Sequence, residues 1–211
     1  MNNTAINQRP VILLLDTTGQ GCHIGLVIGD KCHLLSDLSP QNHAKQLLSL
    51  IDQLLISHQL TAQDLTGIVY TQGPGAFTGI RIGVSVVQGL ALALNIPTLG
   101  VSSLHALAWQ AAHICLNNNP RVLVAIDARM KQVYWAIYQF FPTQKWQCLQ
   151  EDAVGLPSDL PEYDACIGDG IALLSTPQTS LTIEREIRLD LLWQLIQQGL
   201  NHHWLNWSTE L

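Results

Sequence analysis

The first forty residues alternate short apolar runs with turn residues. Residues 11–15 are continuously apolar and lead into the sequence Asp-Thr-Thr-Gly at 16–19, which predicts a buried strand followed by a turn. A second apolar run at 22–28 predicts another strand, and the Gly29-Asp30 pair after it is a hairpin signal. Residues 32–38 complete the hairpin, so the pattern predicts three strands in succession.

After residue 38 the apolar residues recur at a helical spacing. Leucine and isoleucine lie three and four positions apart between residues 47 and 55, which predicts an amphipathic helix over 40–57. Its N-cap would be Ser39, with proline at the first helical position. The following elements are predicted to be a strand at 68–71, a helix from the N-cap Thr78 to Asn95, a strand at 97–101 and a helix over 104–116 capped by Ser102 or Ser103.

The opening pattern returns after the polar segment 117–120. A strand over 121–126 ends in Asp127, and the next strand begins six residues later at 133. The same spacing separates Asp16 from residue 22, which is the trace that a duplicated α/β unit would leave.

The remaining chain predicts a strand at 163–167 and a helix over 184–199 that stops at Gly199. The sequence therefore predicts one mixed α/β protein with two unequal lobes. Its parts would be a polar N-terminal extension at 1–10, an N-terminal lobe at 11–117 and a smaller C-terminal lobe at 118–211.

The second predicted helix is apolar in nearly every direction around its axis. Such a helix is buried on all sides, either inside one molecule or between two. Gly79 and Gly83 are four residues apart, as are Ser85 and Gly89, and small residues at that spacing let another helix approach closely. One interpretation is a core helix; the other is that this helix and the first form an intermolecular bundle. The residues assigned to that interface are His43, Leu47, Leu50, Ile51, Leu54, Gly79, Gly83, Val86, Val87 and Leu90.

The composition favours a folded protein that associates with others. Hydrophobic residues make up 47% of the chain and charged residues 12%, which excludes disorder and suggests that a partner covers apolar surface. The net charge of -6 argues against a chain that holds nucleic acid by itself, because such binding depends on Lys and Arg contacts to phosphate.

Cysteine spacing and hydropathy indicate the compartment. The five cysteines include no C-x-x-C pair, which favours reduced thiols over disulfides or a zinc site. The first ten residues contain no apolar signal segment, and the apolar stretch 84–96 is interrupted by polar residues. We therefore predict a cytoplasmic protein without a membrane span.

Two features resemble nucleotide-binding chemistry. The run Gly-Pro-Gly-Ala-Phe-Thr-Gly at 73–79 precedes a helix, where free N–H groups can bind an anion, but it matches neither the P-loop nor the G-x-G-x-x-G fingerprint. Aspartates at strand ends can hold Mg²⁺ beside a nucleotide, although they also cap turns. The candidate nucleotide-binding residues are Asp16, Thr17, Thr18, Gly73, Gly75, Thr78 and Asp127; no metal site is predicted.

Several ordered motifs resemble the TsaB (YeaZ) family, whose paralogue is TsaD. They are Leu-Asp-Thr-Thr at 15–18, Asn42-His43, the glycine-rich run 73–83, Gly-Val-Ser at 100–102, and Val-Ala-Ile-Asp-Ala-Arg-Met at 124–130 with Val-Tyr-Trp at 133–135. The last of these is typical of the TsaB side. The resemblance covers about residues 11–138.

The resemblance implies a duplicated RNase H-like fold of the actin/Hsp70/sugar-kinase superfamily. It also implies pairing with TsaD through the first two helices, an ATPase partner TsaE, and a homodimer through the same surface when the chain is alone. In that family TsaD transfers the threonylcarbamoyl group from threonylcarbamoyl-AMP to adenosine beside the tRNA anticodon. ATP, Mg²⁺ and threonylcarbamoyl-AMP would be used by the partner subunits, and tRNA would be held mainly by the complex.

One difference from the paralogue decides the expected role. TsaD-like proteins carry an H-x-x-x-H metal pair after the strand at 97–101, and the matching positions are Ser103 and Leu107. Leucine cannot ligate a metal, so we expect a non-catalytic scaffold subunit. The alternatives are a nucleotide-dependent small-molecule kinase of the same superfamily and a metallopeptidase, although no H-E-x-x-H motif supports the latter.

Overall fold

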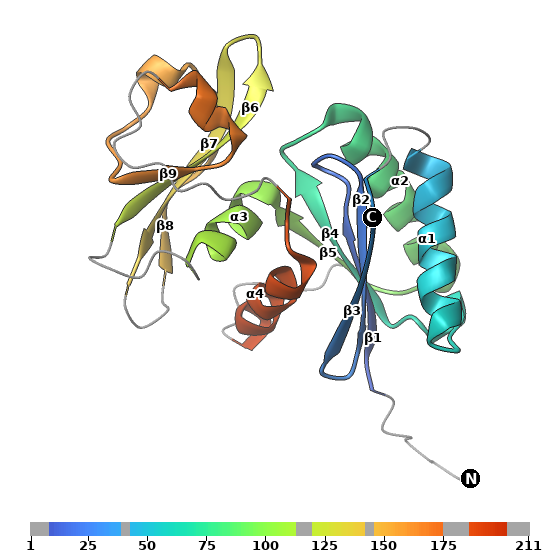
Figure 1. Ribbon diagram of the computed structural model, residues 1–211. Helices are drawn as coiled ribbons and strands as arrows, with labels where there is room; N and C mark the ends of the chain where they lie inside the picture. The colour runs from blue at the N-terminus through green and yellow to red at the C-terminus, as the bar shows by residue number, and fades with distance from the viewer. Residues whose placement is uncertain (1–8, 39–42, 113–119, 142–145, 175–185, 202–211) are drawn as a thin grey trace.

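The computed structural model describes residues 9–38, 43–112, 120–141, 146–174 and 186–201 (Figure 1). Two mixed sheets form its frame. The first contains β1 (Val11–Asp16), β2 (Cys22–Ile28), β3 (Lys31–Asp37), β4 (Gly67–Gly73) and β5 (Thr98–Ser102), in the order β3-β2-β1-β4-β5. The second contains β6 (Arg121–Arg129), β7 (Gln132–Phe140), β8 (Trp146–Gly155) and β9 (Ala165–Ile167), in the order β8-β7-β6-β9.

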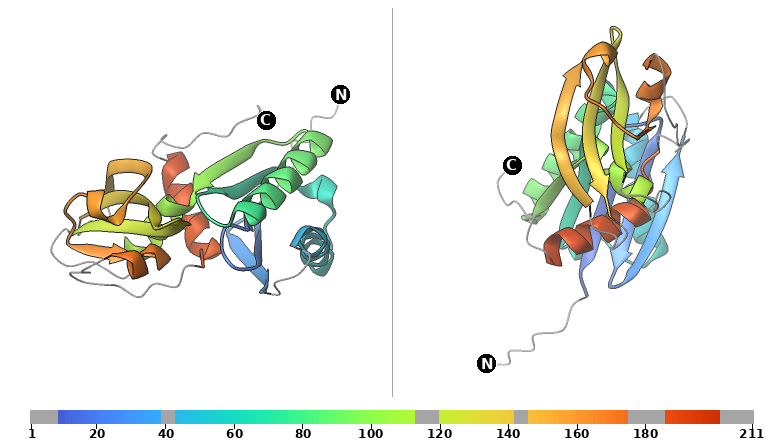
Figure 2. Two further views of the ribbon diagram at one scale, coloured as in Figure 1. Left: turned by 90° about the horizontal axis from the view of Figure 1, so that it is seen from above. Right: turned by 90° about the vertical axis from the view of Figure 1, so that its left-hand side faces the viewer.

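The second sheet repeats the topology of the first. In each, the first strand pairs antiparallel with the second, the second pairs antiparallel with the third, and the first pairs parallel with the fourth. This repeat confirms the duplicated RNase H-like fold with two unequal lobes that the resemblance implied. Seen from above, the two lobes lie side by side (Figure 2).

Within the described residues, four α-helices pack in two pairs. They are α1 (His43–Ser57), α2 (Phe77–Leu94), α3 (Ser103–Ala112) and α4 (Leu189–Asn201), and short 3-10 turns occur at Ala62–Asp64, Pro157–Asp159 and Asp169–Leu173. Helices α1 and α2 lie together against the outer face of the first sheet, whereas α3 and α4 lie between the two sheets (Figure 1). The N-terminal lobe is thus covered by helices on both faces.

The helices between the sheets tie the lobes together. Helix α3 contacts β6, β7 and β9 of the second sheet, and α4 contacts β1, β2 and β3 of the first. One hydrophobic core therefore runs through both lobes. It includes Leu14 and Val69 of the first sheet, Val124 of the second, Leu107 of α3 and Leu195 of α4. The division of the chain at residues 117/118 remains a prediction, because residues 113–119 lie outside the described part.

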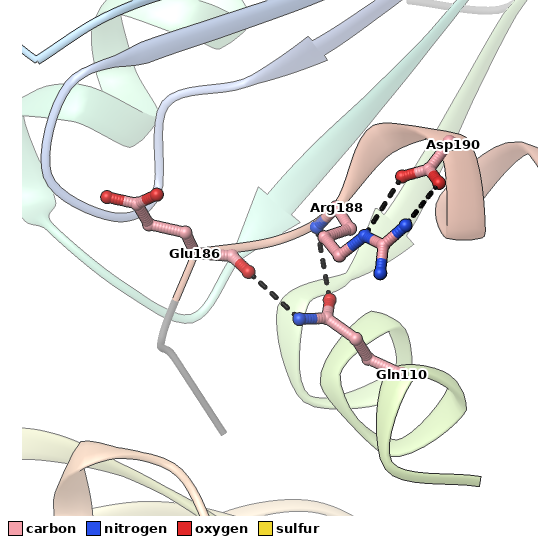
Figure 3. A network of polar contacts seen from close by, with 4 residues as sticks. All are labelled: Gln110, Glu186, Arg188 and Asp190. Atoms are coloured by element: carbon pink, nitrogen blue, oxygen red, sulfur yellow. Dashed lines mark hydrogen bonds and ion pairs between the residues drawn. The ribbon is translucent and has the colours of Figure 1, made fainter. Parts of the chain in front are cut away.

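A buried glutamine secures the segment that enters α4 (Figure 3). The Gln110 carboxamide donates to the Glu186 carbonyl and accepts from the Arg188 backbone N–H, both at 3.0 Å. The Arg188 guanidinium in turn pairs with Asp190 at 2.7 Å in the first turn of α4. One side chain of α3 thereby satisfies two backbone groups of the segment that crosses back to the first lobe.

Most predicted helices and strands are confirmed to within a few residues. Of the predicted helix ends, some are confirmed and others are wrong. Asn95 ends α2 in the left-handed conformation, and the Ser102 hydroxyl accepts from the His105 N–H at the start of α3, as predicted. Thr78 was wrongly predicted as an N-cap: α2 begins at Phe77 after Ala76, which offers no capping side chain. Gly199 was also wrongly predicted as a stop, because α4 continues to Asn201.

Other predictions fall at the edges of the described chain. Ser39 and the start of the first predicted helix, residues 113–116 of the third, and Cys115 lie outside the described residues. The four cysteines that are described are all free thiols, as expected. Helix α2 is, by length and composition alone, apolar enough to cross a membrane. A helix covering a sheet of a folded domain passes the same test, and α2 packs on β4.

Replacing Gln110 by leucine is expected to destabilise the fold. Leucine fills a similar space but removes the partner of the Glu186 carbonyl and of the Arg188 N–H, two part-buried groups, at a cost of up to about 1–3 kcal/mol for each. Urea denaturation measures the loss. The exposed Gln147 on β8 provides the matched control, and Gln147→Leu should leave the midpoint nearly unchanged. Equal midpoints for the two variants would contradict the assigned role of Gln110.

Candidate functional site

Asp16 lies at the end of β1 and is almost fully buried. Its Oδ1 accepts three hydrogen bonds, from the Thr18 N–H at 3.0 Å, from the Thr18 hydroxyl at 2.7 Å and from the Thr71 hydroxyl. Its Oδ2 has no partner among the described residues. The carboxylate therefore holds the turn after β1 to the neighbouring strand β4 and keeps one oxygen uncommitted. The sequence did not single out Thr71, which no motif marks.

The turn after β1 lies directly on the start of α2. A Cβ added to Gly79 would lie 2.0 Å from the Thr17 carbonyl oxygen, and one on Gly83 would lie 2.3 Å from the Thr17 hydroxyl oxygen. A Cβ on Gly75 would lie 2.4 Å from the Thr18 carbonyl oxygen. These distances are too short for any side chain. Glycine at the three positions therefore allows the turn to lie directly against the helix.

Hydrogen bonds close this contact further. The Ala76 N–H donates to the Thr18 carbonyl at 2.7 Å, and the Thr17 hydroxyl donates to the Gly79 carbonyl at 2.8 Å. An N–H group that could have bound an anion at the start of α2 thus binds the chain's own backbone. The space between turn and helix does not fit a phosphate. Gly73, the last residue of β4, has a φ of 103°, a conformation that glycine adopts readily.

The other candidate nucleotide residues do not join this cluster. Thr78 is the second residue of α2 and its side chain is exposed. The Asp127 carboxylate stays in its own hairpin, where it accepts from the Arg129 backbone N–H at 2.7 Å and pairs with the Arg129 guanidinium at 3.2 Å. Among the described residues, no hydrogen bond or ion pair links Asp127 with Asp16. The structure brings together the Asp16 half of the predicted site only.

The positions that match the paralogue's metal pair are buried in α3. Ser103 and Leu107 are both almost inaccessible, and the Ser103 hydroxyl has no hydrogen-bond partner among the described residues. Between them, the His105 ring packs edge-on against Trp146 with centroids 4.4 Å apart. Burial lowers the pKa of His105 to about 4, so this imidazole is neutral at pH 7.

The Ser102 hydroxyl, one residue before α3, donates to the Asp152 carboxylate on β8. Burial raises the pKa of Asp152, while the hydrogen bond from Ser102 acts in the opposite direction. This contact joins the end of β5 in the first lobe to the second sheet. Together with the packing of His105, it makes the start of α3 a structural junction between the lobes.

Most side chains predicted to face a partner are buried inside the chain. Leu47, Leu50, Ile51 and Leu54 of α1 and Val87 of α2 belong to the core between these helices and the first sheet. A Cβ on Gly79 or Gly83 would meet Thr17 of the same chain. These seven assignments to the interface are therefore corrected. Val86 and Leu90 are half-buried at the edge of that core, and the side chain of His43 lies outside the described residues.

The outward faces of α1 and α2 nevertheless expose several large apolar side chains. Phe77 and Leu92 on α2 are 67% and 77% exposed, and Ile56 and Leu48 on α1 are 72% and 49% exposed. On the outer face of α2 the single charged residue is Arg81, whose guanidinium lies 3.8 Å above the Phe77 ring. Only 22% of the α2 residues are buried. The sequence pattern predicted an apolar surface on these helices, but most of the residues assigned to that surface face the sheet.

The glycines of α2 provide a test of the turn contact. Gly79→Ala and Gly83→Ala should each destabilise the protein by about 1–3 kcal/mol through overpacking, with Gly79→Ala the worse because it meets a backbone oxygen. Gly89→Ala is the matched control. No atom lies within 4 Å of its Cβ position, so alanine should stabilise the helix by about 0.8–1 kcal/mol.

A second substitution separates the contact from general helix effects. Thr17→Ala removes the hydroxyl that Gly83→Ala would meet, so it should recover part of the stability of Gly83→Ala but little of that of Gly79→Ala. Chemical denaturation of the single and double variants measures this coupling. Purely additive effects of Thr17→Ala and Gly83→Ala would contradict the described packing.

Comparison with known proteins places this geometry in a family. The family model of TsaD, tRNA N6-adenosine threonylcarbamoyltransferase, matches residues 37–163, which is more than half of the chain. The tRNA threonylcarbamoyladenosine biosynthesis protein TsaB of Escherichia coli K12 is 36% identical over 151 residues, which cover 72% of this chain and 64% of that protein. The protein of the same name from Haemophilus influenzae is 35% identical over 130 residues, which cover 61% of this chain and 54% of the relative.

A solved structure extends the likeness over the whole fold. The structure of YeaZ from Pseudomonas aeruginosa superposes with a TM-score of 0.78 at 29% sequence identity, over 95% of this chain and 96% of that one. The chain spans less than two thirds of the length of the two curated relatives above. With the matching motifs, the duplicated sheets and these likenesses in agreement, the chain belongs to the TsaB/YeaZ family of TsaD-like proteins.

Proposed function

We propose that this chain is a non-catalytic scaffold subunit of the cytoplasmic complex that forms N6-threonylcarbamoyladenosine in tRNA. Its partners would be the catalytic subunit TsaD and the ATPase TsaE, and without them it would form a homodimer. The proposal rests first on the family, whose relatives carry the name of this biosynthesis. The observation that carries the scaffold role is the apolar outer face of α1 and α2.

On that face, exposed apolar side chains of α1 and α2 lie among few charged ones. Helix α2 has the composition of a buried helix, yet its outer residues Phe77, Leu92 and Ala93 face away from the chain's own core. Clustered apolar residues on a protein surface mark sites of association. A second protein that covers α1 and α2 would bury them, and phenylalanine over arginine is a typical anchor at such interfaces.

Two further observations support the absence of catalysis. The positions of the paralogue's metal ligands hold Ser103 and Leu107, and both are buried in the junction between the lobes. The turn after β1 fills the start of α2 with its own atoms. The net charge of -6 supports a role in which another subunit contacts most of the tRNA. ATP, Mg²⁺ and threonylcarbamoyl-AMP would then serve the partner subunits.

One observation favours a nucleotide-dependent kinase as the second candidate. Asp16 keeps a buried oxygen without a partner among the described residues, as a carboxylate that meets a cation would. Against it stand the closed turn and the engagement of Asp127 with Arg129. For the metallopeptidase alternative, the part of the chain that the structure describes contains no group of three His, Cys, Asp or Glu residues placed to hold a metal.

Charged substitutions on the outer face should abolish pairing with TsaD. Leu92→Asp and Phe77→Asp each place an unpaired carboxylate in the proposed interface, and anchor residues there cost about 2 kcal/mol or more, roughly a thirtyfold loss of affinity. Analytical ultracentrifugation of the chain mixed with TsaD from the same organism measures the pairing. Because both side chains are exposed, the thermal midpoint of the free chain should change little.

The matched control is Met130→Asp. Met130 is exposed at the tip of the β6–β7 hairpin, and its positive φ of 52° suits aspartate. This variant should pair with TsaD like the parent. Leu47→Asp would not be informative, since Leu47 is in the core and its replacement would unfold the helix pair. Undiminished pairing by both Leu92→Asp and Phe77→Asp would remove the outer face from the proposal.

Calorimetry separates the scaffold from the kinase. The purified chain, titrated with ATP and Mg²⁺, should show no micromolar binding, because the turn after β1 occupies the start of α2. Micromolar binding that disappears in Asp16→Asn would support the kinase instead. The amide keeps an oxygen for the three donors at Oδ1 and removes the negative charge that would face a cation.

A further inference from the structure

A cavity of about 470 Å³ lies between the edge strand β3 and the C-terminal end of α1. Two histidines from these separate elements line it, His33 on β3 and His58 directly after α1. Their ring centroids are 4.0 Å apart and the rings are tilted by 53°. Two imidazoles this close in a cavity are a metal-binding arrangement that neither the family motifs nor the proposed scaffold role explains.

The hydrogen bonds of His58 fix the nitrogen that it can offer. Its Nδ1 lies 3.0 Å from the Leu54 carbonyl oxygen, which can only accept, so Nδ1 carries the proton in that bond. In the neutral ring, Nε2 then holds the free lone pair. A backbone carbonyl that accepts from one nitrogen of an imidazole while the other binds metal is the usual arrangement around protein metal sites.

The end of α1 favours a cation, while the charge of Lys31 near His33 acts in the opposite direction. The cavity lies at the C-terminal end of α1, where the last carbonyls and the helix dipole attract positive charge. Gln53 lines the same cavity and can supply an oxygen ligand, whereas the Ser57 hydroxyl donates to the Leu54 carbonyl at 2.8 Å. The two rings are tilted and not stacked in parallel. Metal–nitrogen bonds to imidazole are about 2.0–2.1 Å long.

We propose that His33 and His58 bind one first-row transition-metal ion, Zn²⁺, Ni²⁺ or Cu²⁺, with water and the Gln53 side-chain oxygen completing its coordination. The ion would link the edge strand β3 to the C-terminal end of α1. The same helix carries Ile56 and Leu48 on its outer face. The proposal is independent of the scaffold role, because it concerns the free chain and requires no partner.

Titration calorimetry of the metal-free chain with Zn²⁺ tests the proposal. The adjacent His202 and His203 offer a second imidazole pair, so both are first replaced by glutamine in the parent protein. In that parent we expect one equivalent of Zn²⁺, and His33→Gln and His58→Gln should each weaken its binding at least tenfold. Zn²⁺ should also raise the thermal midpoint of the parent but not that of the double variant.

Two controls make every outcome decisive. His43→Gln, at the opposite end of α1, should bind Zn²⁺ like the parent, and matching thermal midpoints without metal verify that the variants are folded. Absence of binding by the parent would overturn the proposal. Unchanged binding by the His33→Gln/His58→Gln double variant would also overturn it. If that binding disappears when thiols are alkylated, the ion belongs to cysteine and not to the histidine pair.

Discussion

The contact between the turn after β1 and the first half of α2 determines the rest of this structure. Gly75, Gly79 and Gly83 leave no side chain between backbone and helix, and Thr17 and Thr18 fill the space. The contact fixes the rotation of α2 about its axis. It therefore decides that Val87 and Ala91 face the sheet while Phe77 and Leu92 face outward. The same contact joins the Thr18 carbonyl to the Ala76 N–H at the start of α2.

The second constraint is the core shared by the two lobes. Because α3 packs under the second sheet and α4 under the first, neither lobe can move without disturbing apolar contacts of the other. Gln110 and the Ser102–Asp152 hydrogen bond add polar links across the same junction. A molecule joined in this way suits a rigid support better than an enzyme that closes its lobes around a substrate.

Period and turn chemistry in the sequence predicted every described strand except β8, the four described α-helices and the duplication. They missed β8, a mostly exposed strand whose polar residues show no clear alternation, and 3-10 turns such as Asp169–Leu173. The candidate site was predicted in part. Asp16 was found because it ends an apolar strand, but its partner Thr71 is distant in sequence. Glycine spacing revealed a close approach in α2 without revealing that Thr17 of the same chain makes it.

The central claim is that a second protein covers the outward face of α1 and α2. A photo-crosslinking amino acid placed at position 92 tests it most directly, in the chain mixed with TsaD and illuminated, with the same amino acid at position 130 for comparison. We expect a covalent product with TsaD from position 92, which is 77% exposed on α2, and none from the hairpin tip at position 130. A product from position 130 and none from position 92 would contradict the account.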